Sequence, residues 1–194
     1  MTPQDVRTAT AADREAILDT LVLSFSGDPC ARFVWPNSGA FMAGWRHFVM
    51  AMGGRAFDHG TAFVTEDHAA AALWLPPGVK SDGEALGALV EGSAPEARKA
   101  TLAQVGEQME EAHPQEPHWY LALVGCDPAH QGRGLGSLLI EEGLRRCDEQ
   151  GLPAYLESSN PKNIPLYERH GFEVIGQVRP DDFPGVYPML RPAR

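Results

Sequence analysis

Three glycines at alternate positions form the part of the sequence best suited to bind a negatively charged group. Gly132, Gly134 and Gly136 follow an apolar stretch that ends at Cys126, and they precede leucines at helical spacing. A helix N-terminus presents unpaired amide N–H groups and the positive end of the helix dipole, and glycines let a ligand approach the backbone closely. Arg133 adds a cation within the run. The pattern predicts a phosphate-binding turn, with a tight turn that binds nothing as the alternative.

Two common phosphate-binding motifs do not fit this turn. A Walker loop requires Gly-Lys-Ser/Thr, which the sequence lacks. The dinucleotide fingerprint, counted from Gly132, requires a glycine or alanine at position 137, which is Ser137. Glu157 lies about 20 residues further on, as that fingerprint requires. However, residues 127–131 separate the strand from the glycines, whereas a dinucleotide-binding fold turns at once.

Two other motifs, in order and with a strand and a helix between them, connect the chain to a family. The first is a Gln-x-x-Gly-x-Gly pattern made of Gln131, Gly134 and Gly136. The second is an Asn-x6-Tyr pattern followed by Gly-Phe, made of Asn160, Tyr167, Gly171 and Phe172. On these motifs the chain resembles the GNAT superfamily of acyl-CoA-dependent N-acetyltransferases. More narrowly, segments 116–121 and 153–158 and the Gln131 loop resemble the puromycin N-acetyltransferase group.

The resemblance implies a fold, a co-substrate and a set of contacts. The fold is α/β (α+β), one GNAT domain over residues 1–194. Its mixed, mostly antiparallel sheet of about seven strands is splayed between the strands at 119–126 and 153–158, with helices on both faces. Residues 1–117 form mainly the acceptor side, and residues 118–178 form the acetyl-CoA-binding core. The implied acetyl-CoA-binding residues are Val124, Gly125, Cys126, Gln131, Gly132, Arg133, Gly134, Leu135, Gly136, Asn160 and Tyr167.

Two side chains are candidates for the acid and the base of acetyl transfer. The resemblance places Tyr167 near the thioester sulfur, where a phenol with a pKa near 10 can protonate the leaving thiolate; a core tyrosine is the alternative. Strand alternation puts Glu157 on the face of Tyr155, which makes it a candidate for the base. A structural carboxylate and a water chain are its alternatives. His118 titrates near neutrality, but six residues at about 3.3 Å each put it about 20 Å from Val124, so we expect a role at the strand entry.

Composition restricts the partners. Lys plus Arg number 16 and Asp plus Glu number 26, giving a net charge of −10, which disfavours binding to nucleic acid or anionic membranes. The longest apolar run, 69–75, is far shorter than the ~20 residues of a membrane span. The three cysteines lack CxxC spacing and the histidines lack HxH or HExxH spacing, so we expect neither disulfides nor a metal. A cytoplasmic monomer or homodimer is expected.

The predicted function is transfer of an acetyl group from acetyl-CoA to the primary amine of a small molecule, by direct attack in a ternary complex. One alternative is a protein Nα- or lysine acetyltransferase, which requires an open peptide groove. The other is a catalytically idle acyl-CoA-binding regulatory module.

Apolar spacing and turn residues predict the elements that hold these groups. Helices are expected from Thr10 to about 25, then over 37–53, 82–112 with a break near 92–93, 134–149 and 160–171. Strands are expected over 5–9, 62–66, 69–75, 119–126, 153–158, 172–178 and 186–191. Gly27-Asp28-Pro29 is expected to end the first helix, with the next starting near Asn37. Trp35, Phe41 and Trp45 are interpreted as core rather than as walls of a substrate site.

Overall fold

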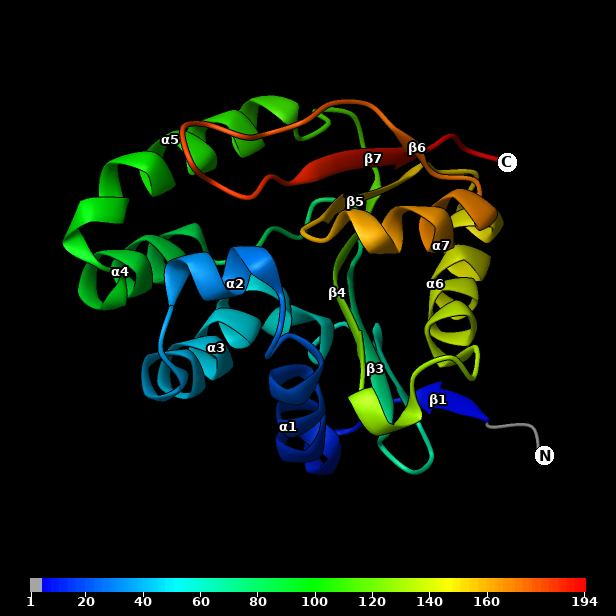
Figure 1. Cartoon of the computed structure of the whole chain (residues 1–194). Coiled ribbons are helices and arrows are strands. Elements are labelled where there is room, and N and C mark those ends of the chain that lie inside the picture. Colours follow the sequence, from blue (N-terminus) through cyan, green and yellow to red (C-terminus); the bar gives the residue numbers. More distant parts are fainter. Residues whose placement is uncertain (1–4) are drawn as a thin grey trace.

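The computed structural model of the chain describes residues 5–194, whose strands form one sheet in the order β1-β2-β3-β4-β5-β7-β6 (Figure 1). The strands are β1 (Val6–Thr8), β2 (Ala62–Thr65), β3 (Ala70–Leu75), β4 (Trp119–Cys126), β5 (Ala154–Ser158), β6 (Glu173–Val174) and β7 (Tyr187–Arg191). Among the strands of residues 5–194, only β4 and β5 pair in parallel, and every other neighbouring pair is antiparallel. The predicted mixed, mostly antiparallel sheet is confirmed.

Helices cover both faces of this sheet. They are α1 (Arg14–Ser24), α2 (Pro29–Val34), α3 (Ser38–Gly53), α4 (Gly83–Ser93), α5 (Glu96–Ala112), α6 (Leu135–Gln150) and α7 (Ile164–Arg169). One buried cluster packs α1 and α3 against the sheet, and a second packs α6 and α7 against its other face. Figure 1 shows α1 and α3 on one side of β3 and β4 and α6 on the other.

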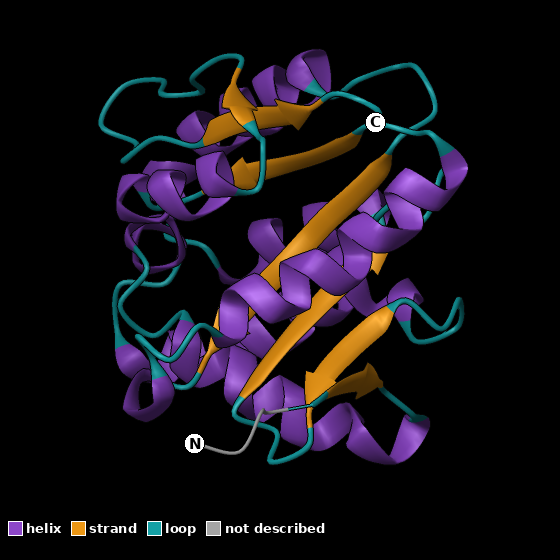
Figure 2. Ribbon diagram, turned by 90° about the vertical axis from the view of Figure 1, so that its right-hand side faces the viewer, coloured by secondary structure: helices purple, strands orange, loops and turns teal. Residues whose placement is uncertain are grey.

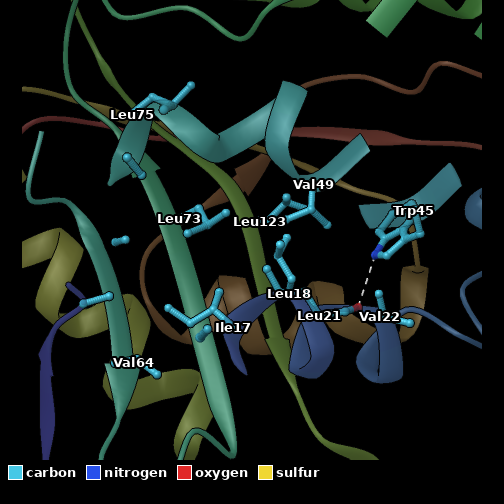
Figure 3. Packing of buried hydrophobic residues seen from close by; sticks show 14 of the residues in the cluster. Ile17, Leu18, Leu21, Val22, Trp45, Val49, Val64, Leu73, Leu75 and Leu123 are labelled. Carbon is cyan, nitrogen blue, oxygen red and sulfur yellow. Dashed lines mark hydrogen bonds between the residues drawn. The ribbon is translucent and has the colours of Figure 1, made fainter. Parts of the chain in front are cut away.

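The stripe of α1 predicted from its spacing is the centre of the first cluster. Ile17 and Leu21 are fully buried, and Leu73 and Leu123 of the sheet lie in the same cluster (Figure 3). Burying one such side chain stabilises the fold by about 1.5–3 kcal/mol. The Trp45 indole N–H donates to the carbonyl of Leu21 at 3.1 Å and fixes α3 against α1. Trp35, Phe41 and Trp45 are all buried, as a core interpretation predicts.

The splay between β4 and β5 has a visible cause in β4. The two strands pair only over their first three residues, which end with Leu121 opposite Leu156. In the β3–β4 ladder Leu123 faces Leu73 and Leu121 faces Trp74, so Ala122 is an extra residue on β4. Such a bulge bends its strand and increases the twist. Figure 2 shows β4 and β5 adjacent at their starts and apart at their ends, so the predicted splay is confirmed.

The predicted elements are wrong in two places, where one helix was not predicted and one strand is shorter than expected. Helix α2 was not predicted, although the Asp28 carboxylate accepts from the amides of Cys30 and Ala31 and Pro29 fills the first turn. The same pattern of a capping residue followed by proline marks a helix start at Asn160, where it was predicted. The strand expected over 172–178 consists of Glu173–Val174 and one separate bridge between Val178 and Val186.

Candidate active site

The glycine turn adopts a backbone that requires glycine at two positions. Gly132 and Gly134 have φ angles of 75° and 83°, and a residue with a side chain in this region costs about 1–2 kcal/mol. A Cβ atom on either would meet nothing within 4 Å, so the backbone conformation, and not crowding by the protein, demands glycine. Gly134 is the N-cap of α6, and Leu135 is its first residue. The turn therefore places the open N-terminus of a 16-residue helix, with its unpaired amides, beside an exposed loop.

The edge of β4 that leads to this turn has no strand beside it. Residues 123–126 pair with β3 on one side, and within residues 5–194 no strand pairs with residues 122–126 on the other. An amide-bearing molecule can bind such an edge as an added strand would. Crowding, and not a positive φ angle, explains the glycine at position 125, because a Cβ atom added there would lie 2.1 Å from the Ser24 hydroxyl oxygen of α1. Cys126 is half-buried, and burial raises the pKa of its thiol, which opposes a nucleophilic role.

Tyr167 lies on α7 and packs into the cluster on the α6 side of the sheet. Its ring meets Phe172 edge-on with centroids 6.3 Å apart, and the residue is 7% exposed. No residue from 5 to 194 hydrogen-bonds its hydroxyl. Burial, and secondarily the negative charge of Asp28, raises the pKa of the phenol above its usual value, so it stays protonated at neutral pH. Asn160 caps the turn before α7 by accepting from the amide of Lys162 at 3.1 Å.

Glu157 lies beyond the last β4–β5 pair, on the opposite face of β5 from Tyr167. Its side chain is 6% exposed, its Oε2 accepts from the Tyr120 hydroxyl, and its Oε1 lies 3.5 Å from Nδ1 of His113. Burial and the nearby carboxylate raise the pKa of Tyr120 far above its usual value, so it remains a donor. The phenol of Tyr167 and the carboxylate of Glu157 are therefore both buried, on opposite faces of the sheet.

Sequence reasoning missed two members of this group. Tyr120 lies within the strand predicted over 119–126, and His113 follows the helix predicted over 82–112, but the sequence analysis assigned neither of them a role. His118 does lie at the entry to β4, as predicted, but its Nε2 is 3.0 Å from Nε2 of His113 and so joins it to Glu157. The position of Tyr120 beside Glu157 follows from the register of β4 and β5, in which Tyr120 pairs with Tyr155, and the sequence alone does not supply that register.

A third buried cluster reaches the residue after β5, since the Cys30 thiol donates to the backbone carbonyl of Ser159 at 3.4 Å. It joins α2 and α5 to the segment before β7, and its members are Cys30, Phe33, Val105, Val178, Phe183 and Val186. The Ser159 hydroxyl donates to the buried carboxylate of Asp28 at 2.6 Å and ties α2 to the end of β5. Burial raises the pKa of Asp28.

The described part of the chain offers neither a cluster of metal ligands nor a membrane-spanning helix. Among residues 5–194, no three His, Cys, Asp or Glu side chains converge to hold a metal ion. In the same range, none of the helices combines the length and the apolar character needed to cross a membrane.

Comparison with known proteins identifies the family. The family model described as Acetyltransferase (GNAT) family matches residues 43–172, which is more than half of the chain. The protein therefore belongs to the GNAT acetyltransferase family. This confirms the expectation drawn from the Gln131 and Asn160 motifs, whereas the narrower likeness to puromycin N-acetyltransferases stays a prediction.

Individual relatives match either a short segment or the whole fold. An uncharacterized N-acetyltransferase of Schizosaccharomyces pombe is 50% identical over 54 residues, covering 28% of this chain and 22% of that protein. A mycothiol acetyltransferase of Thermomonospora curvata is 39% identical over 71 residues, covering 35% of this chain and 24% of that protein. The chain thus spans less than a quarter of the length of these curated relatives.

Solved structures match over nearly the full length. A Corynebacterium glutamicum protein described as histone acetyltransferase HPA2 and related acetyltransferase has a TM-score of 0.69 and 26% identity, covering 98% of this chain and 97% of that one. An agmatine N-acetyltransferase has a TM-score of 0.62 and 17% identity, covering 96% and 97%. The second likeness concerns the fold alone. Together they confirm the predicted GNAT architecture.

Proposed function

We propose that this protein transfers the acetyl group of acetyl-CoA to the primary amine of a small molecule, in a ternary complex and without a covalent enzyme intermediate. The observation that carries the proposal is the glycine turn at the N-terminus of α6, which residues 127–131 connect to the unpaired edge of β4. One feature suits a diphosphate and the other suits the amides of pantetheine. Their adjacency suits a single ligand that carries both groups.

The proposed contacts follow from these two features. The turn residues Gln131, Gly132, Arg133, Gly134, Leu135 and Gly136 would hold the diphosphate through backbone amides and the Arg133 cation. Val124, Gly125 and Cys126 would hydrogen-bond the pantetheine along the β4 edge, and Asn160 and Tyr167 would face it from the other side of the splay. In this arrangement residues 118–178 form the acetyl-CoA core, and residues 1–117 form mainly the acceptor side.

The chemistry assigned to the side chains is proton transfer and stabilisation of charge. Acetyl-CoA supplies the thioester, whose C–S bond breaks as the amine nitrogen forms the new C–N bond. Glu157 would take the proton that the acceptor ammonium must lose before attack. The raised pKa of Tyr167 lies above the value of about 8.5 typical of a thiol, so full proton transfer to the leaving thiolate is uphill. Tyr167 would therefore stabilise the thiolate as a hydrogen-bond donor.

The enclosure of the acceptor side supports a small molecule over a peptide. The cluster of α2, α5 and the segment before β7 is tied to Ser159, just after β5, where an extended peptide would need an open groove. A buried carboxylate at Glu157 suits a cationic amine. Agmatine, in the name of the agmatine N-acetyltransferase of similar fold, is a cationic amine of this class, and it is therefore one of the probes. We also propose a cytoplasmic location, which the three free cysteines support.

The test is to incubate the protein with acetyl-CoA and a panel of amines, including agmatine and arylalkylamines, with a lysine peptide alongside. Thiol release is followed by colour, and the N-acetyl product by mass spectrometry, so that thioester hydrolysis is not counted. We expect product from at least one small amine. Acetylation of the peptide alone supports a protein acetyltransferase. Binding of CoA without product from any acceptor supports a regulatory module, and either result contradicts the proposal.

A further inference from the structure

The carboxylate of Glu157 is the inner end of a chain of polar contacts that leads to the protein surface. Its Oε1 lies 3.5 Å from Nδ1 of His113, whose Nε2 lies 3.0 Å from Nε2 of His118. His118 Nδ1 lies in turn 2.7 Å from the backbone carbonyl oxygen of Glu116. Exposure rises along the chain, because the Glu157 side chain is 6% exposed, that of His113 is 32% exposed, and Glu116 lies on the surface.

The ring of His113 is held in place on several sides. Its centroid lies 4.7 Å from that of Tyr155, 5.1 Å from that of Tyr120 and 4.8 Å from that of His118, all near edge-on. The segment after α5, whose helix ends at Ala112, thus delivers a packed histidine to a buried carboxylate. The arrangement is a fixed group of side chains and not a chance surface contact.

The donors and acceptors of these side chains allow one additional proton to lie on any of three residues. The Glu116 carbonyl can only accept, so a hydrogen-bonded His118 carries a proton on Nδ1. The three contacts can then all be satisfied with the additional proton on Glu157, on His113 or on His118, because each imidazole can donate through one nitrogen and accept through the other. These three arrangements contain the same number of protons and keep every contact. They differ only in where one proton lies.

We propose that His113 and His118 form a proton relay that carries the proton taken up by Glu157 to the solvent. This inference rests on the proposed function, in which Glu157 is the base. The acceptor ammonium gives one proton to Glu157, and Oε1 passes it to Nδ1 of His113. The Nε2 proton of His113 then moves to Nε2 of His118, and His118 releases its Nδ1 proton to water. One proton enters and one leaves, and the two rings then exchange protons with water to restore their starting tautomers.

The surroundings of His118 favour its neutral form, which is ready to accept a proton. Burial lowers the pKa of His118, and this effect outweighs the opposing hydrogen bond to the carbonyl of Glu116. The other titratable groups that face the two histidines are Tyr120 of β4, Tyr155 of β5 and Glu157. The pKa values of both tyrosines are raised by burial and by the charge of Glu157, so they remain neutral. The carboxylate is thus the negative charge that faces the two rings.

The kinetic test compares kcat at increasing buffer concentration for the wild type, His118→Gln and the control His59→Gln. His59 is an exposed histidine that takes no part in the relay. A relay removes the proton without help from the buffer, so we expect the wild type and the control to be insensitive to it. We expect His118→Gln to lower kcat at least about tenfold at low buffer, within the range that acid–base groups contribute. Imidazole buffer should restore kcat, and the KM for acetyl-CoA should not change. Wild-type kcat in His118→Gln, or a loss that imidazole does not restore, overturns the relay.

A second measurement needs no turnover. The imidazole ¹⁵N resonances report the titration of each histidine, and Glu157→Gln removes the negative charge that favours the imidazolium form. We expect the titration midpoint of His118 to fall in this variant, because the charge of Glu157 raises its pKa in the wild type. A His118 midpoint that does not move overturns the coupling. A wild type that acetylates no amine overturns the proposed function, and the ¹⁵N titration still decides whether the chain is coupled.

Discussion

Replacing Tyr167 with phenylalanine removes one hydroxyl and leaves the packing of the ring intact. Within residues 5–194 that hydroxyl makes no hydrogen bond, so the folded protein loses no partner and we expect the free energy of unfolding to change by no more than about 0.5 kcal/mol. In the reaction the hydroxyl would donate to a thiolate that carries full charge only as the C–S bond breaks. A hydrogen bond to a charged group contributes about 1.5–3 kcal/mol, which corresponds to a decrease in kcat of about 10- to 150-fold.

The assay is thiol release from acetyl-CoA with the best acceptor amine, alongside urea unfolding of the same variant. The matched control is Tyr187→Phe, since Tyr187 lies on β7 and its hydroxyl contacts Gln177 at 3.2 Å. We expect the control to retain kcat and Tyr167→Phe to retain its KM for the acceptor. An unchanged kcat in Tyr167→Phe refutes the assignment of this hydroxyl to the leaving sulfur. A large loss of stability refutes the interpretation that the hydroxyl has no structural role.

Three further predictions concern the turn, the core and the acid limit of stability. Gly134→Ala imposes about 1–2 kcal/mol of backbone strain at a φ of 83°, so we expect calorimetry to show CoA binding weakened by about 5- to 30-fold. Gly143→Ala puts a Cβ 2.1 Å from the ring of Trp74, and urea unfolding should show a loss of about 1–3 kcal/mol from overpacking. The carboxylate of Asp13 has its pKa lowered, chiefly by the Arg7 guanidinium, so its contribution is present above the unfolded pKa of about 3.9 and lost as the pH falls below it. The difference in unfolding free energy between wild type and Asp13→Asn should therefore be largest near neutrality and shrink in acid, and an unchanging difference contradicts this interpretation.

Much of the fold was readable because its signals are local. The leucines of α6 and the apolar stripe of α1 repeat at helical spacing, and the core of α1 is as predicted. The break between α4 and α5 lies where Gly92-Ser93 predicted it. The capped start at Asn160 was equally readable, since a side-chain acceptor followed by proline is a local instruction to begin a helix. Asp28 followed by Pro29 has the same pattern, but it was predicted only to end the first helix. The helix that follows has six residues, which is too short to show a periodic apolar pattern.

The parts that sequence could not supply depend on contacts between distant segments. The bulge at Ala122 is defined by its register with β3, about 50 residues earlier in the chain, and it is invisible in the spacing of β4 alone. The association of His113 with Glu157 joins the end of α5 to the end of β5 and depends on how those elements pack. Glu157 and Tyr167 were found because a strand alternates and a motif matches, whereas Tyr120 and His113 act through tertiary contacts.

The most direct test of the central claim is a crystal structure of the protein grown with CoA. The account predicts the diphosphate within hydrogen-bond distance, about 3 Å, of the amides at the start of α6, around Gly134 and Leu135. It also predicts the pantetheine along residues 122–126 of β4. A CoA molecule bound at full occupancy elsewhere, with the turn and the β4 edge in contact only with water, contradicts the account.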